Sequence, residues 1–209
     1  MRFVKKRTLE ILLSSIPGFP EPKITLEQYV SPPHLASRLV WVAAVTYGDI
    51  AGARVLDLGA GTGRLGIGAA LMGASQVVLL DVDREALKVS REAADGLGVS
   101  SVIDTVCSDV KAPPLRPVFD VVIQNPPFGV HRRGADMDFL HTALSLGGVV
   151  YSVHKLETKD FIVRKLREIG GEVEILFGEE ILLPPIYKFH YKNRHKVDVV
   201  VIRAERKRK

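Results

Sequence analysis

Cysteine is almost absent from this chain, in which Cys107, expected at the end of a buried strand, is the single example among 209 residues. One cysteine excludes an internal disulfide bond and leaves no cysteine cluster for a structural zinc ion. The six histidines have no cysteine or carboxylate at the spacing of zinc ligands, so no metal site is predicted. Such a composition is typical of the cytoplasm, where thiols stay reduced, and a cytoplasmic location is expected.

Long hydrophobic runs and internal repeats are missing too. Although 46% of the residues are hydrophobic, no uninterrupted run approaches the roughly 20 residues that span a bilayer. The basic amino terminus leads into a stretch that Glu10 interrupts, which predicts an amphipathic helix and no signal peptide. One face of this helix carries Leu9, Leu12, Leu13 and Ile16. We expect a soluble protein of one domain, with a helical segment (1–50) before an α/β core (51–209).

Apolar runs and helical patterns alternate along the rest of the chain. The runs that favour strands cover residues 54–58, 76–80, 101–107, 119–123, 148–153, 172–177 and 197–203. The patterns that favour helices cover residues 65–72, 84–94, 137–145 and 159–169. This alternation predicts a Rossmann-like, doubly wound α/β fold. Because no helix separates the last two strands, they should pair antiparallel through Pro184 and Pro185, which gives a seven-stranded, mostly parallel sheet with one antiparallel edge strand.

A turn of glycines follows the first predicted strand. Gly59, Gly61 and Gly63 come directly after the strand 54–58 and before the helix 65–72. Glycines allow positive φ and a close approach to a ligand, and the helix that follows presents free N–H groups. A G-x-G pattern alone is weak evidence, and the third glycine of the pattern G-x-G-x-x-G falls at Gly66 only if counting starts at Gly61. Binding of NAD therefore stays open at this point.

Carboxylates stand at the carboxyl ends of the predicted strands. Asp57 lies in the first strand, Asp81 ends the second and Asp109 follows the third. Open parallel sheets bind their ligands at this edge. Asp81 is placed to accept hydrogen bonds from both hydroxyls of a ribose, and Asp109 can accept one from the amino group of an adenine. Asp83 is instead predicted to cap the helix 84–94.

The most informative stretch is Asn125-Pro126-Pro127-Phe128, which follows the predicted strand 119–123. Proline fixes its φ and removes a backbone donor, so the carbonyl groups of Asn125 and Pro126 can point outward. Together with the ring of Phe128 they form a pocket that can hold a planar group bearing an NH2. The alternative interpretation is a turn that ends the strand and buries a phenylalanine.

Taken in order, these residues resemble a class I S-adenosylmethionine-dependent methyltransferase, and the resemblance covers nearly the whole chain. The Asn-Pro-Pro-Phe motif is similar to that of amino-methyltransferases, and within them the chain resembles the archaeal and eukaryotic small-subunit ribosomal RNA adenine-N6 methyltransferases. The matching stretches are residues 26–29, 57–63, 81–83, 125–129, 136–140, 151–155 and 187–190. One departure is Val30-Ser31, where the family commonly has Pro-Thr.

The resemblance implies a cofactor, a catalytic core and a partner. S-Adenosylmethionine would be the cofactor, and 51–209 the catalytic core. The expected cofactor contacts are Gln28, Ser31, Asp57, Gly59, Gly61, Gly63, Asp81 and Asp109. The expected catalytic residues are Asn125, Pro126, Pro127 and Phe128. A small zinc-binding activator protein pairs with such enzymes and is the expected partner besides RNA.

Basic residues predict a surface for nucleic acid. The net charge is +5, and Arg132 and Arg133 stand only a few residues beyond the proposed pocket. Lys188, Phe189 and His190 belong to a segment in which aromatic and basic residues alternate. This combination suits an unpaired nucleic-acid strand. An equal alternative is that the alternate aromatic residues form the inward side of a strand.

The sequence therefore predicts N6-methylation of adenine in RNA, with small-subunit ribosomal RNA as the expected substrate. Two alternatives remain. A protein glutamine-amide N-methyltransferase faces the same chemical problem, because the lone pair of an amide nitrogen is also delocalised. A non-catalytic module that binds RNA or a nucleotide would keep the same fold, although an intact Asn125 speaks against it.

Overall fold

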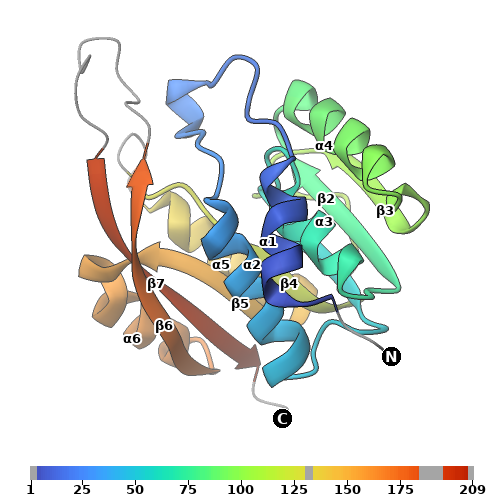
Figure 1. Ribbon diagram of the computed structural model, residues 1–209. Helices are drawn as coiled ribbons and strands as arrows, with labels where there is room; N and C mark the ends of the chain where they lie inside the picture. The colour runs from blue at the N-terminus through green and yellow to red at the C-terminus, as the bar shows by residue number, and fades with distance from the viewer. Residues whose placement is uncertain (1–3, 130–133, 184–194, 207–209) are drawn as a thin grey trace.

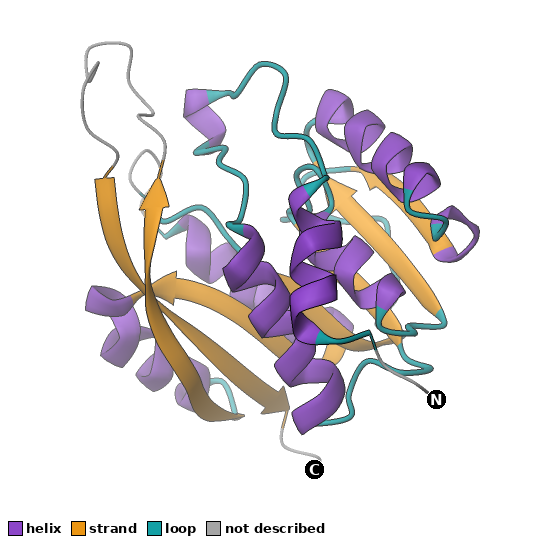
Figure 2. Cartoon of the chain, in the orientation of Figure 1, coloured by secondary structure: helices purple, strands orange, loops and turns teal. Residues whose placement is uncertain are grey.

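The computed structural model describes residues 4–129, 134–183 and 195–206, and within these ranges seven strands form one sheet with six α-helices on its two faces (Figures 1 and 2). The strands are β1 Arg54–Leu58, β2 Gln76–Asp81, β3 Ile103–Cys107, β4 Phe119–Gln124, β5 Gly147–Lys155, β6 Gly171–Leu183 and β7 His195–Arg206. The α-helices are α1 Lys6–Ser14, α2 Pro33–Trp41, α3 Arg64–Leu71, α4 Arg84–Gly96, α5 Ala135–Leu146 and α6 Lys159–Glu168. None of the helices in the described ranges is both long and apolar enough to cross a membrane.

The strand order across the sheet is β3-β2-β1-β4-β5-β7-β6. The five strands from β3 to β5 are parallel to their neighbours, and β7 runs antiparallel to both β5 and β6. The predicted fold class is therefore confirmed. The reversed strand β7 lies between β5 and β6, so both antiparallel pairings occur at this side of the sheet.

The inner strands of the parallel part, such as β1, bury both of their faces, whereas no residue of the edge strand β3 is fully buried. Within β1, Val55 belongs to one hydrophobic cluster, while the next residue, Leu56, belongs to another on the opposite face. This follows from the strand period of two, and it requires the nearly continuous apolar runs seen in the sequence. Helices α1 to α4 contribute to the first cluster, and α5 and α6 contribute to the second (Figure 1).

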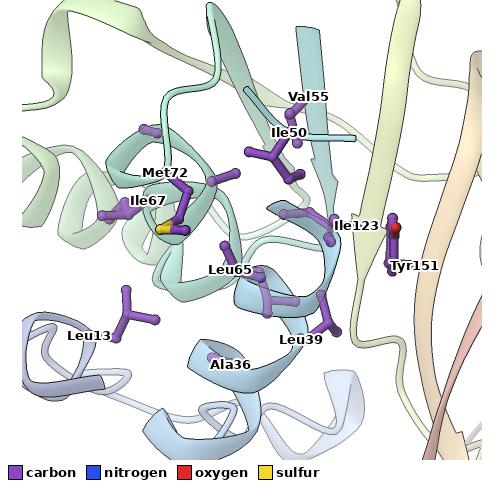
Figure 3. Packing of buried hydrophobic residues seen from close by; sticks show 14 of the residues in the cluster. Leu13, Ala36, Leu39, Ile50, Val55, Leu65, Ile67, Met72, Ile123 and Tyr151 are labelled. Atoms are coloured by element: carbon purple, nitrogen blue, oxygen red, sulfur yellow. The ribbon is translucent and has the colours of Figure 1, made fainter. Parts of the chain in front are cut away.

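The amino-terminal helices belong to the same core as the sheet. Leu13 of α1 and Leu39 of α2 are fully buried and pack in one cluster with Ile67 of α3 and Ile123 of β4, as Figure 3 shows. The amphipathic helix expected near the amino terminus is thus present, and its apolar face is buried against the rest of the protein. The division into a helical segment and a catalytic core stays a prediction.

Several element boundaries differ from the expected ones. β3 begins at Ile103, because a short 3-10 turn occupies Ser100–Val102. β6 continues to Leu183, beyond the predicted residue 177. Cys107 is exposed, contrary to the prediction, because β3 is an edge strand that pairs only with β2 among the described strands. The expected Pro184-Pro185 connection lies outside the described residues.

Candidate active site

A cavity of about 250 Å³ opens at the carboxyl ends of β1, β2 and β4. From β1 the chain goes to β2 and β3 on one side, and later fills β4 and β5 on the other side. Connections that diverge in this way leave a crevice at the carboxyl edge of the sheet, where α/β proteins bind their ligands. We define the strap as residues 16–32, between α1 and α2 (Figure 1). Residues of the strap and of the start of α5 complete the wall of the cavity.

The glycine turn after β1 forms one end of the cavity. Gly59, Gly61 and Gly63 have φ of +73°, +55° and +82°, in the left-handed region that favours glycine. A Cβ atom at Gly59 would lie 2.5 Å from Cε1 of Phe139, and one at Gly61 would lie 2.8 Å from Cζ of Phe19. The backbone of the turn is therefore in close contact with aromatic rings from α5 and from the strap.

Asp57 lies beneath this turn and fixes the helix that follows it. Its side chain is 2% exposed, and its Oδ2 accepts a hydrogen bond from the backbone N–H of Gly66 in α3 at 2.7 Å. The pKa of Asp57 is raised to about 7, mainly because the carboxyl group is buried; the hydrogen bond from the Gly66 N–H opposes this rise, and the nearby carboxylate of Asp81 adds to it. Asp57 lines the cavity, but its described hydrogen bond is structural.

Asp81, at the end of β2, has both oxygens engaged by backbone donors. Oδ2 accepts from the N–H of Gly61 at 2.7 Å, and Oδ1 accepts from the N–H of Asp83 at 2.8 Å. Burial raises its pKa, although these two hydrogen bonds lower it. A carboxylate oxygen has two lone pairs, so Asp81 keeps acceptor capacity for a ligand in the cavity that it lines.

Asp83 caps α4, as predicted, and also holds the strap. Its Oδ1 accepts from the N–H of Glu85 at 3.1 Å and from Nζ of Lys23 at 2.6 Å, and its Oδ2 accepts from Nε2 of Gln28 at 2.7 Å. Burial raises the pKa of Asp83, but the hydrogen bonds from Gln28 and Lys23 hold it below its usual value. Gln28 lines the cavity as expected, yet its amide serves to attach the strap.

Asn125, directly after β4, lines the other end of the cavity. Its Oδ1 accepts from the hydroxyl of Tyr29 at 2.9 Å, and its Nδ2 donates to Oγ of Ser31 at 2.9 Å. Ser31, which was predicted to contact the cofactor, thus contacts Asn125, which was predicted to be catalytic. Burial raises the pKa of Tyr29, so its phenol is neutral and donates.

The rest of the Asn-Pro-Pro-Phe motif is divided between the cavity and its surroundings. Pro127 lines the cavity, and Pro126 is buried. The ring of Phe128 is tilted by 32° against that of Tyr29, with 5.5 Å between the centroids, and Nζ of Lys155 lies 5.9 Å from the ring of Phe128. Phe128 thus borders the site without belonging to the cavity wall.

Asp109 lines the cavity two residues after the end of β3. Its Oδ1 accepts from the backbone N–H of Lys111 at 2.9 Å, and its Oδ2 has no hydrogen bond to another described residue. The predicted RNA-binding residues Arg132, Arg133, Lys188, Phe189 and His190 all lie outside the described residues. Their role stays a prediction.

Sequence reasoning missed several residues that build the cavity. Arg64 is 8% exposed; its Nη1 donates to the carbonyl of Ser31 and its Nη2 to that of Ile16, each at 2.7 Å. Burial lowers the pKa of Arg64 to about 10, and its Nε has no hydrogen-bond partner within the described part of the chain. Glu27 is buried with a left-handed φ of +51°, a conformation that is rare outside glycine. The one signal for Arg64 in the sequence is that it is a basic residue directly after the glycine turn.

The charges around the cavity are mostly negative. The carboxylate residues in its wall are Glu27, Asp57, Asp81, Asp109 and Asp138, and Arg64 is also part of the wall. Among these, Asp138 lies 3.7 Å from Nζ of Lys111. The arrangement suits a ligand that carries cationic and hydroxyl groups along its length together with one anionic group.

Known proteins share the sequence and the fold. The model of the family "Methyltransferase small domain" matches residues 38–174. The rRNA N6-adenosine-methyltransferase METTL5 of Danio rerio is 40% identical over 204 residues, which cover 96% of this chain and 98% of that protein. The ribosomal protein L11 methyltransferase of Aeromonas hydrophila is 34% identical over 136 residues, which cover 60% of this chain and 43% of that protein.

A solved structure agrees with these matches. The crystal structure of a candidate RNA methyltransferase from Pyrococcus horikoshii has a TM-score of 0.88 to this chain at 39% identity, and the match covers 98% of this chain and 99% of that one. The METTL5 protein and this structure match along nearly the full length, strap and antiparallel strands included. The chain therefore belongs to the methyltransferase small domain family, and within it to the group that contains the METTL5 proteins.

Proposed function

We propose that this protein transfers a methyl group from S-adenosylmethionine to the N6 amine of an adenine in RNA, and that small-subunit ribosomal RNA is its substrate. The observation that carries the proposal is that Asn125 shares one cavity with Asp81 and Asp109. The residues proposed to bind a nucleoside cofactor therefore line the same cavity as the residue proposed to bind an amine. The full-length similarity to a protein named as an rRNA N6-adenosine-methyltransferase supports the choice of RNA and of adenine.

The residues in the cavity fit S-adenosylmethionine, which supplies an electrophilic methyl group on a sulfonium sulfur. Asp81 would accept hydrogen bonds from the ribose hydroxyls, and Asp109 would accept one from the adenine amine. The glycine turn, whose Gly59 and Gly61 make room for the rings of Phe139 and Phe19, would present its backbone to the cofactor beside these rings. Arg64 would bind the carboxylate of the cofactor, because its buried Nε lacks a partner in the described residues.

The acceptor amine needs activation, because its lone pair is delocalised into the adenine ring. Hydrogen bonds from its two N–H groups to Asn125 Oδ1 and to the Pro126 carbonyl would favour a pyramidal nitrogen and localise the lone pair. Phe128 would stack on the base. The protein then holds the amine in line with the methyl group, and positioning is its main catalytic resource.

Methyl transfer would need no reactant other than the adenine amine and S-adenosylmethionine. S-Adenosylmethionine would supply the methyl group: the lone pair of N6 would form the new N–C bond as the C–S bond breaks, and the electrons of the broken bond would stay on the sulfur. The methylated amine then loses one proton to water. Asn125 accepts hydrogen bonds throughout and does not need to change its own protonation state.

The substrate base has to leave its stack to enter the cavity, so an unpaired or flipped adenine is expected. Arg132, Arg133, Lys188, Phe189 and His190 are proposed to contact the RNA around it. Replacing Arg132 and Arg133 by Ala should weaken binding similarly for different RNA sequences. The slope of log K against log salt should fall by about one for each phosphate contact that is lost.

The proposal also includes a protein partner, a cellular location and the extent of the catalytic core. The edge strand β3 pairs only with β2 in the described sheet, and its free side offers a place where a small zinc-binding activator could add a strand. We expect the enzyme to act in the cytoplasm, with 51–209 as the catalytic core. Full activity of the purified chain, with no gain when the activator is added, would remove the partner from the proposal.

The deciding experiment is methyl transfer from radiolabelled S-adenosylmethionine to total RNA and, separately, to total protein, followed by nucleoside analysis. We expect label in RNA as N6-methyladenosine. Label in protein alone would favour glutamine-amide methylation, which uses the same hydrogen-bonding solution. Saturable cofactor binding without transfer to either pool would favour a non-catalytic binding module.

A further inference from the structure

The side chain of Asn125 is held from both ends by two residues of the strap. Oδ1 accepts from the hydroxyl of Tyr29, and Nδ2 donates to Oγ of Ser31, both at 2.9 Å. Tyr29 is also packed against Phe128, which restricts the position of its ring. The amide can therefore not rotate without breaking two hydrogen bonds.

The orientation of this amide decides which chemistry it can perform. Its oxygen accepts hydrogen bonds, whereas its nitrogen carries two donors. The amine of adenine approaches with N–H donors. If the amide were turned by 180°, the NH2 group of Asn125 would face the NH2 group of the substrate, and donors on both sides would be left unpaired.

Tyr29 and Ser31 select one of the two orientations. A phenol is a good donor and a poor acceptor, because the lone pair of its oxygen is delocalised into the ring. The serine hydroxyl accepts readily. The arrangement with Oδ1 toward Tyr29 and Nδ2 toward Ser31 is thus favoured over the turned one. The second lone pair of Oδ1 stays available for the substrate.

The strap that carries these two residues is itself held by α3 and by the N-cap of α4. Arg64 of α3 donates to the carbonyl of Ser31 at 2.7 Å. The other side of the strap is tied to Asp83, which binds Lys23 and Gln28. The positions of Tyr29 and Ser31 are therefore set by the same elements that form the glycine end of the cavity.

We propose that Tyr29 and Ser31 are positioning residues that hold the Asn125 amide with its oxygen available to the acceptor amine. This inference rests on the proposed function, because it concerns the residue to which that function assigns the amine.

A double-mutant cycle with Asn125→Asp tests the inference. A carboxylate has two equivalent acceptor oxygens, so it has no wrong orientation, and Tyr29 and Ser31 can both donate to it. In the Asn125 protein, Tyr29→Phe with Ser31→Ala should lower kcat by about 10- to 100-fold, while the KM for S-adenosylmethionine stays within about threefold. In the Asn125→Asp protein, the same two changes should lower kcat less than about threefold.

Equal losses in both backgrounds would overturn the inference, since they would show an effect on folding or on the cofactor. If Asn125→Asp has no activity, Ser31→Thr decides, because threonine keeps the hydroxyl. Turnover retained with Ser31→Thr but lost with Ser31→Ala, at equal Tm, supports the inference, and equal turnover in the two variants overturns it.

Failure of the proposed function gives a different result. If Asn125→Ala methylates RNA at the rate of the unmodified protein, the assignment of Asn125 itself is wrong. If Asn125→Ala is inactive while the Tyr29 and Ser31 variants are fully active, only the positioning role is wrong.

Discussion

The two ends of the cavity are built in different ways. At the glycine end, Asp57 and Gly66 are 9 residues apart in the sequence, and Asp81 and Gly61 are 20 apart. At the other end, Asn125 is held by Tyr29 and Ser31, at separations of 96 and 94 residues. Side chains bind backbone N–H groups at the first end, whereas side chains bind side chains at the second.

The difference indicates which end can change without loss of the fold. A backbone N–H is present whatever the residue, so the glycine end depends mainly on its carboxylates and on the absence of Cβ atoms. The Asn125 end depends on two hydroxyl groups that single substitutions remove. We therefore expect changes at the glycine end to affect stability and cofactor binding, and changes at the Asn125 end to affect turnover.

The largest effect is expected for Asn125→Ala. Loss of the amide removes an acceptor that acts on the substrate amine, and turnover should fall by about 100- to 1,000-fold, as for other preorganised hydrogen-bonding groups in active sites. Single-turnover kinetics with radiolabelled cofactor measure this. Calorimetric affinity for S-adenosylmethionine and the Tm serve as controls and should stay near their original values. A variant that unfolds would instead make Asn125 a structural residue.

The next effect is a dependence of stability on pH that Asp57 causes. Its pKa is about 7 in the folded protein and near 3.8 in the absence of the fold, so the folded state binds the extra proton between these values. Protonation of Asp57 stabilises the folded state fully below pH 3.8. This stabilisation decreases by about 1.4 kcal/mol for each pH unit between pH 3.8 and pH 7, and it is lost as the pH rises through 7. Denaturant unfolding of Asp57→Asn should show a weaker decline from pH 5 to pH 8 than the original protein. Parallel curves would contradict this.

Asp81→Ala should weaken cofactor binding by about 1–3 kcal/mol, because ribose hydroxyls would lose their acceptor. The same change leaves the N–H of Gly61 unpaired, so part of the loss comes from the turn. Isothermal titration calorimetry gives the affinity, with Asp109→Ala as the companion variant for the adenine side. Unchanged affinity for S-adenosylmethionine would contradict the ribose contact of Asp81, and saturable binding of NAD but not of S-adenosylmethionine by the original protein would show that the glycine turn serves a different cofactor.

An effect of similar size separates close packing at the glycine end from helix propensity. In Gly66→Ala the new Cβ would lie 2.2 Å from Cδ2 of Leu79 and 3.0 Å from Asp57, so stability should fall by about 1–3 kcal/mol. Gly96→Ala is the matched control, because no atom lies within 4 Å of its added Cβ at the end of α4. This control should be neutral or should gain up to about 1 kcal/mol. Equal losses would mean that close packing at Gly66 is unimportant.

The sequence predicted the parts of the site that depend on neighbouring residues. Gly59, Gly61 and Asp81 stand in a strand-turn-helix context that is recognisable within 30 residues, and Asp83 capped its helix as expected. The apolar runs predicted seven strands and the reversal near the end of the chain.

The other parts required the fold. That Tyr29 meets Asn125 depends on the path of the strap over the sheet, and no periodicity encodes a contact across 96 residues. The exposure of Cys107 depends on which strand occupies the edge. Arg64 became part of the site only because two carbonyl groups of the strap lie above α3.

The double use of Asp83 makes one cooperative unit of the strap and the first turn of α4. The carboxylate that accepts the Glu85 N–H also binds Lys23 and Gln28 and is 4% exposed. When the strap leaves, this charge loses two partners and gains water, and its bond to the Glu85 amide weakens. The rate of hydrogen exchange at the Glu85 amide is therefore a local measure of how often the strap leaves Asp83. Binding of a ligand in the cavity should slow this exchange.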